Sequence, residues 1–362
     1  MLIHNDCRHF RGDIPCTPHK LHGVHCEGCT FYDPAPQKVL IIKLGAIGDV
    51  IRTTPILSKL KAQYPKALIY WVTYSPDVLP DAVDIKLTLN LPALLQLEET
   101  DFDLAINLDK DREACALLNR VKATEKKGFS LKAGKCEPIS ASGKHKFETG
   151  VLDDVSKANT KSYVEEIFEI CDLKYEKDDY VLENPFAGKK NWELDKTKKV
   201  IGLNTGCGGR WVTRLWEEKN WTELAIALIA QGFEVVLLGG EQEDAVNKRI
   251  AAGSSAKYFG HFPMKIFIDE IAQCDVVITQ VTMAMHLAIG MKCKLILMNN
   301  IFNRHEFELY GRGEIIEPPT GCDCFYAPSC TRESNGGIHC MKDITPEMVL
   351  SAVKRTLSSE SR

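Results

Sequence analysis

Short, continuously apolar runs alternate with segments of helical periodicity along most of this chain. KVLIIKL (residues 38–44) is apolar nearly throughout, as a parallel strand buried on both faces requires. A second series of such runs opens at KKVIGLNTG (198–206), after a break near residues 184–197. Strands of this kind need helices on both faces of their sheet, so the pattern predicts an α/β protein with two Rossmann-like domains.

The alternation also sets the expected boundaries. We expect strands at 67–74, 102–109, 233–240, 275–280 and 294–300, and helices at 49–65, 160–175, 216–232, 243–253, 268–274 and 283–290. The predicted N-terminal domain is 38–185 and the C-terminal domain is 186–320, with cysteine-rich extensions at 1–37 and 321–362.

Composition argues against several classes of protein. No apolar run approaches the ~20 residues of a transmembrane helix. The N-terminus lacks the apolar core of a signal peptide. The formal net charge of −4 offers no general attraction for nucleic acid. We therefore expect a cytoplasmic protein without a nucleic acid partner.

The chain has 14 cysteines, and eight of them crowd its two ends. The predicted metal ligands are Cys7, Cys16, Cys26 and Cys29 in the head, and Cys322, Cys324, Cys330 and Cys340 in the tail. In a cytosolic protein, clustered cysteines more often bind metal than form disulfides. Thiolates alone do not separate zinc from iron or an iron–sulfur cluster, and reduced structural cysteines or disulfides are alternatives for the head. The six scattered cysteines are expected to be buried as small apolar residues.

A glycine-rich junction follows the first predicted strand. KLGAIGDVIRTTP (43–55) places Asp49 where a helix begins and little side-chain bulk covers the backbone. Such a turn suits an anionic ligand, a catalytic carboxylate beside one, or simply a tight junction with Asp49 as a cap. It lacks the G-x-G-x-x-G pattern of dinucleotide oxidoreductases.

A similar junction opens the second series. In NTGCGGRWVTRLW, Gly206, Gly208 and Gly209 would let backbone amides approach a phosphate, and Arg210 and Arg214 add positive charge. Two such junctions in facing domains predict a ligand held between them, with its phosphates on the second domain.

Several segments resemble one known family. KVLIIKLGAIGDVIRTTPILSKLKAQYP resembles the opening of family 9 glycosyltransferases, the ADP-heptose:lipopolysaccharide heptosyltransferase group. WEEKNWTELAIALIAQGFEVVLLGGEQE and VITQVTMAMHLAIGMKCKLILMNN are similar to its C-terminal segments, and the cysteine-bearing tail resembles that of many members. The resemblance covers roughly residues 38 to 355 and leaves the head outside. It implies a GT-B fold, two domains facing a central cleft, and inverting sugar transfer without a catalytic divalent metal.

The resemblance also implies roles for single residues. Asp49 would be the general base, because inversion needs a deprotonated acceptor hydroxyl opposite the departing diphosphate. The implied donor-side residues are Thr205, Gly206, Gly208, Arg214, Glu243, Thr282, Met283 and His286. Val281 and Met283 stand where the family has an aspartate and a glycine, so the donor sugar is left open. For His286, the alternative is a buried, hydrogen-bonded histidine.

A basic stretch marks the expected acceptor side. Between residues 120 and 146, Lys and Arg outnumber Glu by eight to two. The resemblance places an acceptor in this domain, so Gly48, Lys126 and Lys127 are predicted to face it. An anionic glycan, a protein, or the inner-membrane surface that carries the glycan would be the partner, and a solvated flexible loop is the alternative.

Two functions of different classes remain. The leading hypothesis is an inverting glycosyltransferase that takes a nucleotide-sugar as donor. The alternative is a non-catalytic, metal-stapled binding or scaffold protein derived from the same family. A scaffold has no need of Asp49, which favours the enzyme. Trp216 and Trp221 are predicted to pack in the core rather than to stack on a sugar.

Overall fold

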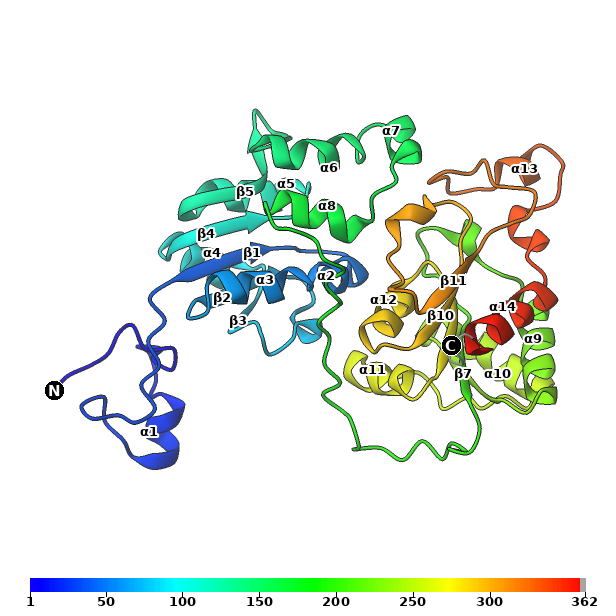
Figure 1. The fold of residues 1–362 in the computed structure, drawn as a ribbon, viewed down its shortest axis with the longest axis horizontal. Coiled ribbons are helices and arrows are strands. Elements are labelled where there is room, and N and C mark those ends of the chain that lie inside the picture. Colours follow the sequence, from blue (N-terminus) through cyan, green and yellow to red (C-terminus); the bar gives the residue numbers. More distant parts are fainter. Residues whose placement is uncertain (359–362) are drawn as a thin grey trace. The chain divides into compact units, whose positions relative to one another are not determined.

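A computed structural model describes residues 1–358 of the chain, shown as a ribbon in Figure 1. The chain divides into two compact units. The first comprises Met1–Gly45, Pro55–Glu148 and Ile167–Tyr175, and the second comprises Ala46–Thr54, Thr149–Glu166 and the chain from Glu176 onward. The short segment that carries Asp49 therefore belongs to the second unit.

The first unit is built on a six-stranded sheet of order β3-β2-β1-β4-β5-β6. Its strands are β1 (Lys38–Ile42), β2 (Leu68–Thr73), β3 (Ile85–Thr88), β4 (Asp101–Asn107), β5 (Lys122–Lys132) and β6 (Lys135–Pro138). All neighbours pair in parallel except β5 and β6, which form an antiparallel hairpin. Residues 39–42 of β1 are fully buried, because this strand has a neighbour on each side and packed faces above and below.

Amphipathic helices cover this sheet. The helices of the unit are α1 (Thr17–His22), α3 (Ile56–Gln63), α4 (Leu91–Glu98), α5 (Arg112–Arg120) and α6 (Lys144–Glu148), while α8 (Tyr163–Ile170) spans the boundary between the units. In α5, Ala114, Leu117 and Leu118 are buried at helical spacing and join the core formed with β1, β2 and β4.

The second unit is built on a wholly parallel sheet of order β11-β10-β9-β7-β8. Its strands are β7 (Val200–Asn204), β8 (Glu234–Leu238), β9 (Val276–Gln280), β10 (Lys294–Met298) and β11 (Gly313–Ile316). Its helices are α2 (Ile47–Thr53), α7 (Asp153–Ala158), α9 (Glu218–Ala230), α10 (Asp244–Ser254), α11 (Met264–Ala272), α12 (Met283–Gly290), α13 (Thr331–Ser334) and α14 (Pro346–Ser358).

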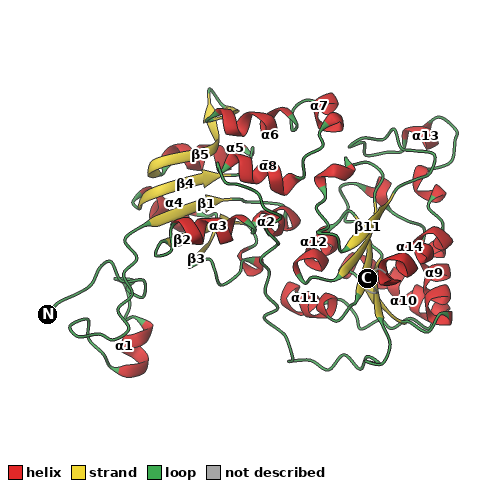
Figure 2. Cartoon of the chain, viewed as in Figure 1, coloured by secondary structure: helices red, strands yellow, loops and turns green. Residues whose placement is uncertain are grey.

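Two helical layers enclose the second sheet (Figure 2). Helices α9, α10 and α14 share one apolar core with the sheet, and α12 packs on β9 and β10 from the other face. Trp216 and Trp221 lie in that core with their rings 4.9 Å apart at 87°. The prediction that these tryptophans pack in the core is confirmed. Within residues 1–358, no helix combines the length and apolarity needed to cross a membrane.

Two local predictions were wrong. The helix expected over 49–65 is interrupted, because Thr54 and Pro55 separate α2 from α3 and proline has no amide to continue the ladder. The basic stretch at 120–146 is not the solvated flexible loop given as the alternative, since β5 extends the sheet beside β4, buries Phe129 and continues into the hairpin strand β6. The scattered cysteines are buried as predicted, except for half-buried Cys136.

Candidate functional site

Three loops leave the second sheet at the same edge. Asn204, the last residue of β7, pairs with Leu238 of β8 on one side and with Thr279 of β9 on the other. The loops that follow these strands therefore start side by side. The strand order reverses between β7 and β9, and the carboxyl edge at such a point is where open α/β sheets bind ligands.

A polar network holds these loops together. The Asn204 Nδ2 group donates to Thr279 Oγ1 at 3.0 Å and to the Gly206 carbonyl at 3.1 Å. Thr282 begins α12, where its Oγ1 accepts from the Ala284 amide at 3.2 Å and lies 3.1 Å from Thr279 Oγ1. Thr205 Oγ1 donates to Asn247 at 2.6 Å. The predicted Thr205 and Thr282 thus shape the edge through their own hydroxyls.

Gly206 and Glu243 lie against each other. A Cβ added to Gly206 would stand 2.0 Å from Glu243 Oε1, so the close approach requires glycine. The other oxygen of Glu243 accepts from the Gly240 amide at 2.9 Å. Gly208 has φ +68°, the left-handed region that glycine adopts freely. The glycines therefore allow the loop after β7 to pack closely, with Gly206 in contact with the carboxylate of Glu243.

Arg214 folds back under the same loop. Its side chain is nearly buried, and it donates to the Cys207 carbonyl at 2.6 Å and to the Trp211 carbonyl at 3.1 Å. Burial lowers the pKa of this guanidinium, and among the described residues no carboxylate pairs with it. A buried cation without a carboxylate partner favours an anion at this position.

Helix α2 packs directly on α12. A Cβ on Gly48 would lie 2.4 Å from His286 Cδ2, so the ring of His286 rests on the glycine backbone. Met283 opens α12, one residue after Thr282. This packing places Gly48 and Asp49 of α2 beside α12, the helix that carries the predicted donor-side residues Met283 and His286.

Asp49 is held by an arginine of its own helix. The Arg52 Nη2 atom lies 2.8 Å from Asp49 Oδ1, and about a third of the Asp49 side chain is exposed (34 %). The Arg52 guanidinium also lies 3.3 Å from the centre of the Tyr163 ring and 4.0 Å from Glu306 Oε2. Burial by itself lowers the pKa of Arg52, but Asp49, Tyr163 and Glu306 outweigh it and raise that pKa. The Asp49 carboxylate thus lies beside a permanent positive charge with one face toward solvent.

His286 is neutral in this environment. Burial first, and the positive charge of Arg52 second, lower its pKa to about 3, while Asp49 opposes them. The Tyr180 hydroxyl lies 3.3 Å from His286 Nδ1. The contacts are those of the alternative considered for this residue, a buried and hydrogen-bonded histidine.

The sequence analysis missed the partners of Asp49. Arg52 lies three residues further along α2, a spacing that places both side chains on one helix face and could have been noticed. Tyr163, Tyr180 and Glu306 come from distant segments with no motif of their own. Tyr326 was missed for the same reason, although its hydroxyl donates to Glu306 at 2.9 Å.

The predicted acceptor residues are not gathered in one unit. Gly48 belongs to the second unit, whereas Lys126 and Lys127 lie on β5 of the first. The Lys127 Nζ atom pairs with Asp172 at 3.1 Å and with Glu125 at 3.3 Å. Lys126 donates to the Asn119 carbonyl at 3.2 Å, and burial lowers its pKa. These two lysines, which were expected to attract an anionic acceptor, therefore make ion pairs and hydrogen bonds within the first unit.

A buried ion pair closes the end of β1. Lys43 pairs with Asp109, which follows β4, and Asp109 Oδ2 also accepts from the Leu44 amide at 2.5 Å. Burial is the main cause that raises the pKa of Asp109, although Lys43 opposes it. The sequence analysis missed this pair, which ties together the two strand ends where the order of the first sheet reverses.

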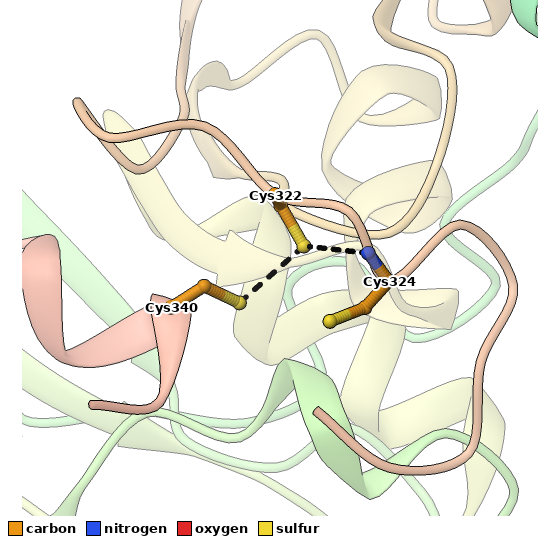
Figure 3. Close-up of side chains that lie close together, drawn as sticks. All are labelled: Cys322, Cys324 and Cys340. Carbon is orange, nitrogen blue, oxygen red and sulfur yellow. Dashed lines mark hydrogen bonds between the residues drawn. The ribbon is translucent and has the colours of Figure 1, made fainter. Parts of the chain in front are cut away.

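The tail cysteines lie together (Figure 3). The sulfur atoms of Cys322 and Cys340 are 3.4 Å apart, and those of Cys324 and Cys330 are 3.7 Å apart. Four thiolates around one tetrahedral ion at ~2.3 Å would stand about 3.8 Å from one another. The two pair distances are close to this spacing. Cys322, Cys324 and Cys340 form one group of ligand atoms within 4.8 Å of one another, and Cys330, His339 and Cys340 form a second group that shares Cys340. The head cysteines are arranged differently, as described below.

Two doubly wound α/β units with glycine-rich loops at a strand-order reversal define the class of nucleotide-binding folds to which GT-B proteins belong. The profile of glycosyltransferase family 9 (heptosyltransferase) matches residues 94–311, which is more than half of the chain. The chain belongs to this family and is a glycosyltransferase. The predicted family and the predicted GT-B fold class are thereby confirmed.

Known relatives are distant but extend over nearly the whole chain. Lipooligosaccharide heptosyltransferase 2 of Haemophilus influenzae is 22% identical, covering 89% of this chain and 100% of the relative. The structure of E. coli ADP-heptose lipopolysaccharide heptosyltransferase II superposes with a TM-score of 0.64 at 18% identity, covering 90% of this chain and 100% of that one. The iron-containing dodecameric glycosyltransferase TibC of enterotoxigenic E. coli has a TM-score of 0.55 at 13% identity, with 90% and 77% covered.

Proposed function

We propose that this glycosyltransferase moves a sugar from a nucleotide-diphosphate donor with inversion, and that Asp49 is the general base. The observation that carries the proposal is the packing of α2 on α12, where the His286 ring rests on Gly48. It brings a partly exposed carboxylate into the same compact unit as the loops expected to hold the donor. Asp49 would accept the proton of an acceptor hydroxyl as that oxygen attacks the anomeric carbon.

Arg52 supports this role by position and charge. Its ion pair fixes one oxygen of Asp49, and the Tyr163 ring and Glu306 fix Arg52 in turn. A general base must be within hydrogen-bond reach of the proton it removes, so a carboxylate with a restrained rotamer is an advantage.

The departing diphosphate would be stabilised without a catalytic divalent metal. Arg214 supplies a buried positive charge, and the glycine-rich loop of residues 205–209 offers backbone amides beside it. Glu243 would contact the nucleoside, because it lies at the same edge and its carboxylate is already oriented by the Gly240 amide. Thr282 would border the donor sugar from the start of α12, while the buried ring of His286 would hold this helix against Gly48.

The names of two relatives and one substitution support a proposal for the donor and the acceptor. The H. influenzae relative is named for lipooligosaccharide and the E. coli structure for ADP-heptose and lipopolysaccharide. We propose an ADP-linked heptose or a related sugar as donor, and a cell-envelope glycan or a protein as acceptor. Val281 is nearly buried and has no group that hydrogen-bonds a hydroxyl, so it contributes shape alone to the choice of sugar.

The tail would hold one structural metal ion. Cys322, Cys324, Cys330 and Cys340 are the proposed ligands, supported by their sulfur spacing and by the burial of three of them. A bound ion would tie the segment before α13 to the 3-10 turn of Cys340–Asp343, which precedes α14, and contribute to folding. TibC is an iron-containing relative, so iron is a candidate beside zinc.

Donor binding tests the function most directly. Native mass spectrometry of the full-length protein against ADP-, UDP-, GDP- and CMP-linked sugars should select one nucleotide class. Incubation of that donor with bacterial glycan fragments should then give a product of inverted anomeric configuration by NMR. A protein that binds no member of the panel, or that gives a product of retained configuration, would contradict the proposal.

A further inference from the structure

The four head thiols line one cavity. Cys7, Cys16, Cys26 and Cys29 all border a hollow of about 280 Å³ inside the head. They come from three places in the head. Cys7 forms an antiparallel β-bridge with Pro34, and Cys16 precedes α1. Cys26 and Cys29 lie in one turn, in which the Cys29 amide donates to the Cys26 carbonyl at 3.2 Å. Residues far apart in a short, loop-rich segment therefore converge on a common space.

The spacing of these thiols differs from that in the tail. Tail sulfurs stand 3.4 and 3.7 Å apart in pairs, and groups of three ligand atoms there lie within 4.8 Å of one another. In the head, as far as the described chain extends, no three Cys, His or carboxylate ligand atoms meet that spacing. A single tetrahedral ion would need sulfur atoms about 3.8 Å apart. The head is therefore not arranged around one ion.

The size and walls of the hollow point to a larger inorganic group. Its volume of about 280 Å³ is many times the ~10–15 Å³ that one water molecule needs on the same measure. Phe10, Ile14, Val24 and Phe31 contribute apolar walls between the thiols. In a four-iron cluster each thiolate binds a different iron, so the four ligands surround the group at wider spacing than around one ion.

We propose that the head binds an iron–sulfur cluster of the four-iron type through Cys7, Cys16, Cys26 and Cys29. The cluster fills the cavity and links the parts of a segment that is too small to fold on its own core. This inference rests on the head alone and is independent of the proposed sugar transfer.

An arginine next to the proposed ligand Cys7 connects the head to the rest of the first unit. Arg8 follows Cys7, and its guanidinium donates to Asp84 at 2.5 Å and to Asp33 at 2.9 Å. Binding of the cluster at Cys7 thus stabilises the backbone that presents Arg8 to the sheet.

Sulfide content distinguishes the cluster from a single ion. The full-length protein, purified without oxygen or reconstituted with ferrous iron and sulfide, should contain about four acid-labile sulfides per chain and absorb broadly in the visible range. The double variant Cys26→Ser/Cys29→Ser should lose the sulfide and the absorption. Cys322→Ser/Cys340→Ser should keep the sulfide and lose only the tail metal. Cys136→Ser, at a half-buried cysteine outside both sets, should change neither.

Several outcomes would overturn the inference. Metal without acid-labile sulfide in the unaltered, reconstituted protein would indicate a single ion, and disulfides among the head cysteines would remove the ligands. Sulfide that persists in the head variant would place the cluster elsewhere. The measurement on the unaltered chain decides the matter even if the head variant misfolds. No sugar transfer is measured, so a failure here leaves the proposed function standing.

Discussion

The segment that follows β1 and the loop that follows β7 use the same backbone device for opposite chemistry. Each is glycine-rich, and in each a glycine lies under a side chain: Gly48 under His286 and Gly206 under Glu243. The first presents the Asp49 carboxylate, already paired with Arg52. The second holds the buried guanidinium of Arg214 with no carboxylate partner in the described chain. This difference matches the roles that we propose for the two residues, a general base at Asp49 and an anion-binding group at Arg214.

Removing the carboxylate tests the first half of this contrast and should have the largest effect. Asp49→Asn should lower the transfer rate by about 10²–10⁴, the usual contribution of a positioned general base. Affinity for ADP, measured by calorimetry, should change by less than ~1 kcal/mol because the phosphates are expected at the other loop. Asp111→Asn, at an exposed carboxylate of the first unit, is the matched control. Near-normal turnover by Asp49→Asn would exclude this residue as the base.

Removing the buried cation tests the second half. Arg214→Ala should weaken binding of both the nucleotide-sugar and the free nucleotide diphosphate, by roughly 1.5–3 kcal/mol for a charge-assisted contact. Arg210→Ala removes an exposed arginine of the same loop and should have a smaller effect. Unchanged diphosphate affinity in a folded Arg214→Ala protein would mean that the phosphates bind elsewhere.

The two glycines allow a direct comparison of stability. A Cβ at Gly48 meets the buried ring of His286, which has no room to move, so Gly48→Ala should cost about 1–3 kcal/mol. A Cβ at Gly206 meets the end of the flexible Glu243 side chain, which can turn away with the loss of one hydrogen bond, about 1 kcal/mol. Urea denaturation of both variants should show this order. The reverse order would mean that the contact of α2 with α12 is loose.

The last comparison concerns the pH dependence of stability. His286 has its pKa lowered from 6.5 to about 3, so below pH 6.5 the unfolded chain takes up a proton that the folded chain refuses. Stability from this residue is retained above pH 6.5 and lost as the pH falls toward 3, by at most ~1.4 kcal/mol per pH unit. His286→Gln should reduce this slope in denaturation measured between these pH values, and His305→Gln, at an exposed histidine, should not. An unchanged slope in His286→Gln would show that the ring is protonated in the folded state.

Much of the fold was predictable because strand burial leaves a local signature. β1, β7, β9 and β10 are short apolar runs, and all four lie within or overlap the predicted ranges. The strand β5 escaped prediction because it is the last parallel strand of its sheet and most of its residues are polar and only partly buried, so its sequence lacks a continuous apolar run. The break between α2 and α3 had a visible cause in Pro55 that was not used.

The site divides in the same way. The glycines that follow β1 and β7, and Asp49 beside one of them, could be identified from the sequence. Close approach of another group to the backbone requires glycine, whatever the tertiary structure around it. The partners of Arg52 and His286 could not be found from the sequence, since Tyr163, Tyr180 and Glu306 meet them only after segments more than a hundred residues apart are packed together.

The cysteines show the limit most clearly. Both sets were recognisable as four-sulfur groups from local spacing, because ligand chemistry depends on residue type and is written in the chain. Tertiary structure alone decided that tail sulfurs lie 3.4 and 3.7 Å apart while the head thiols surround a cavity. Distances between ligands depend on how the intervening backbone closes on itself, and that closure is set by packing against the rest of the unit rather than by the number of residues between them.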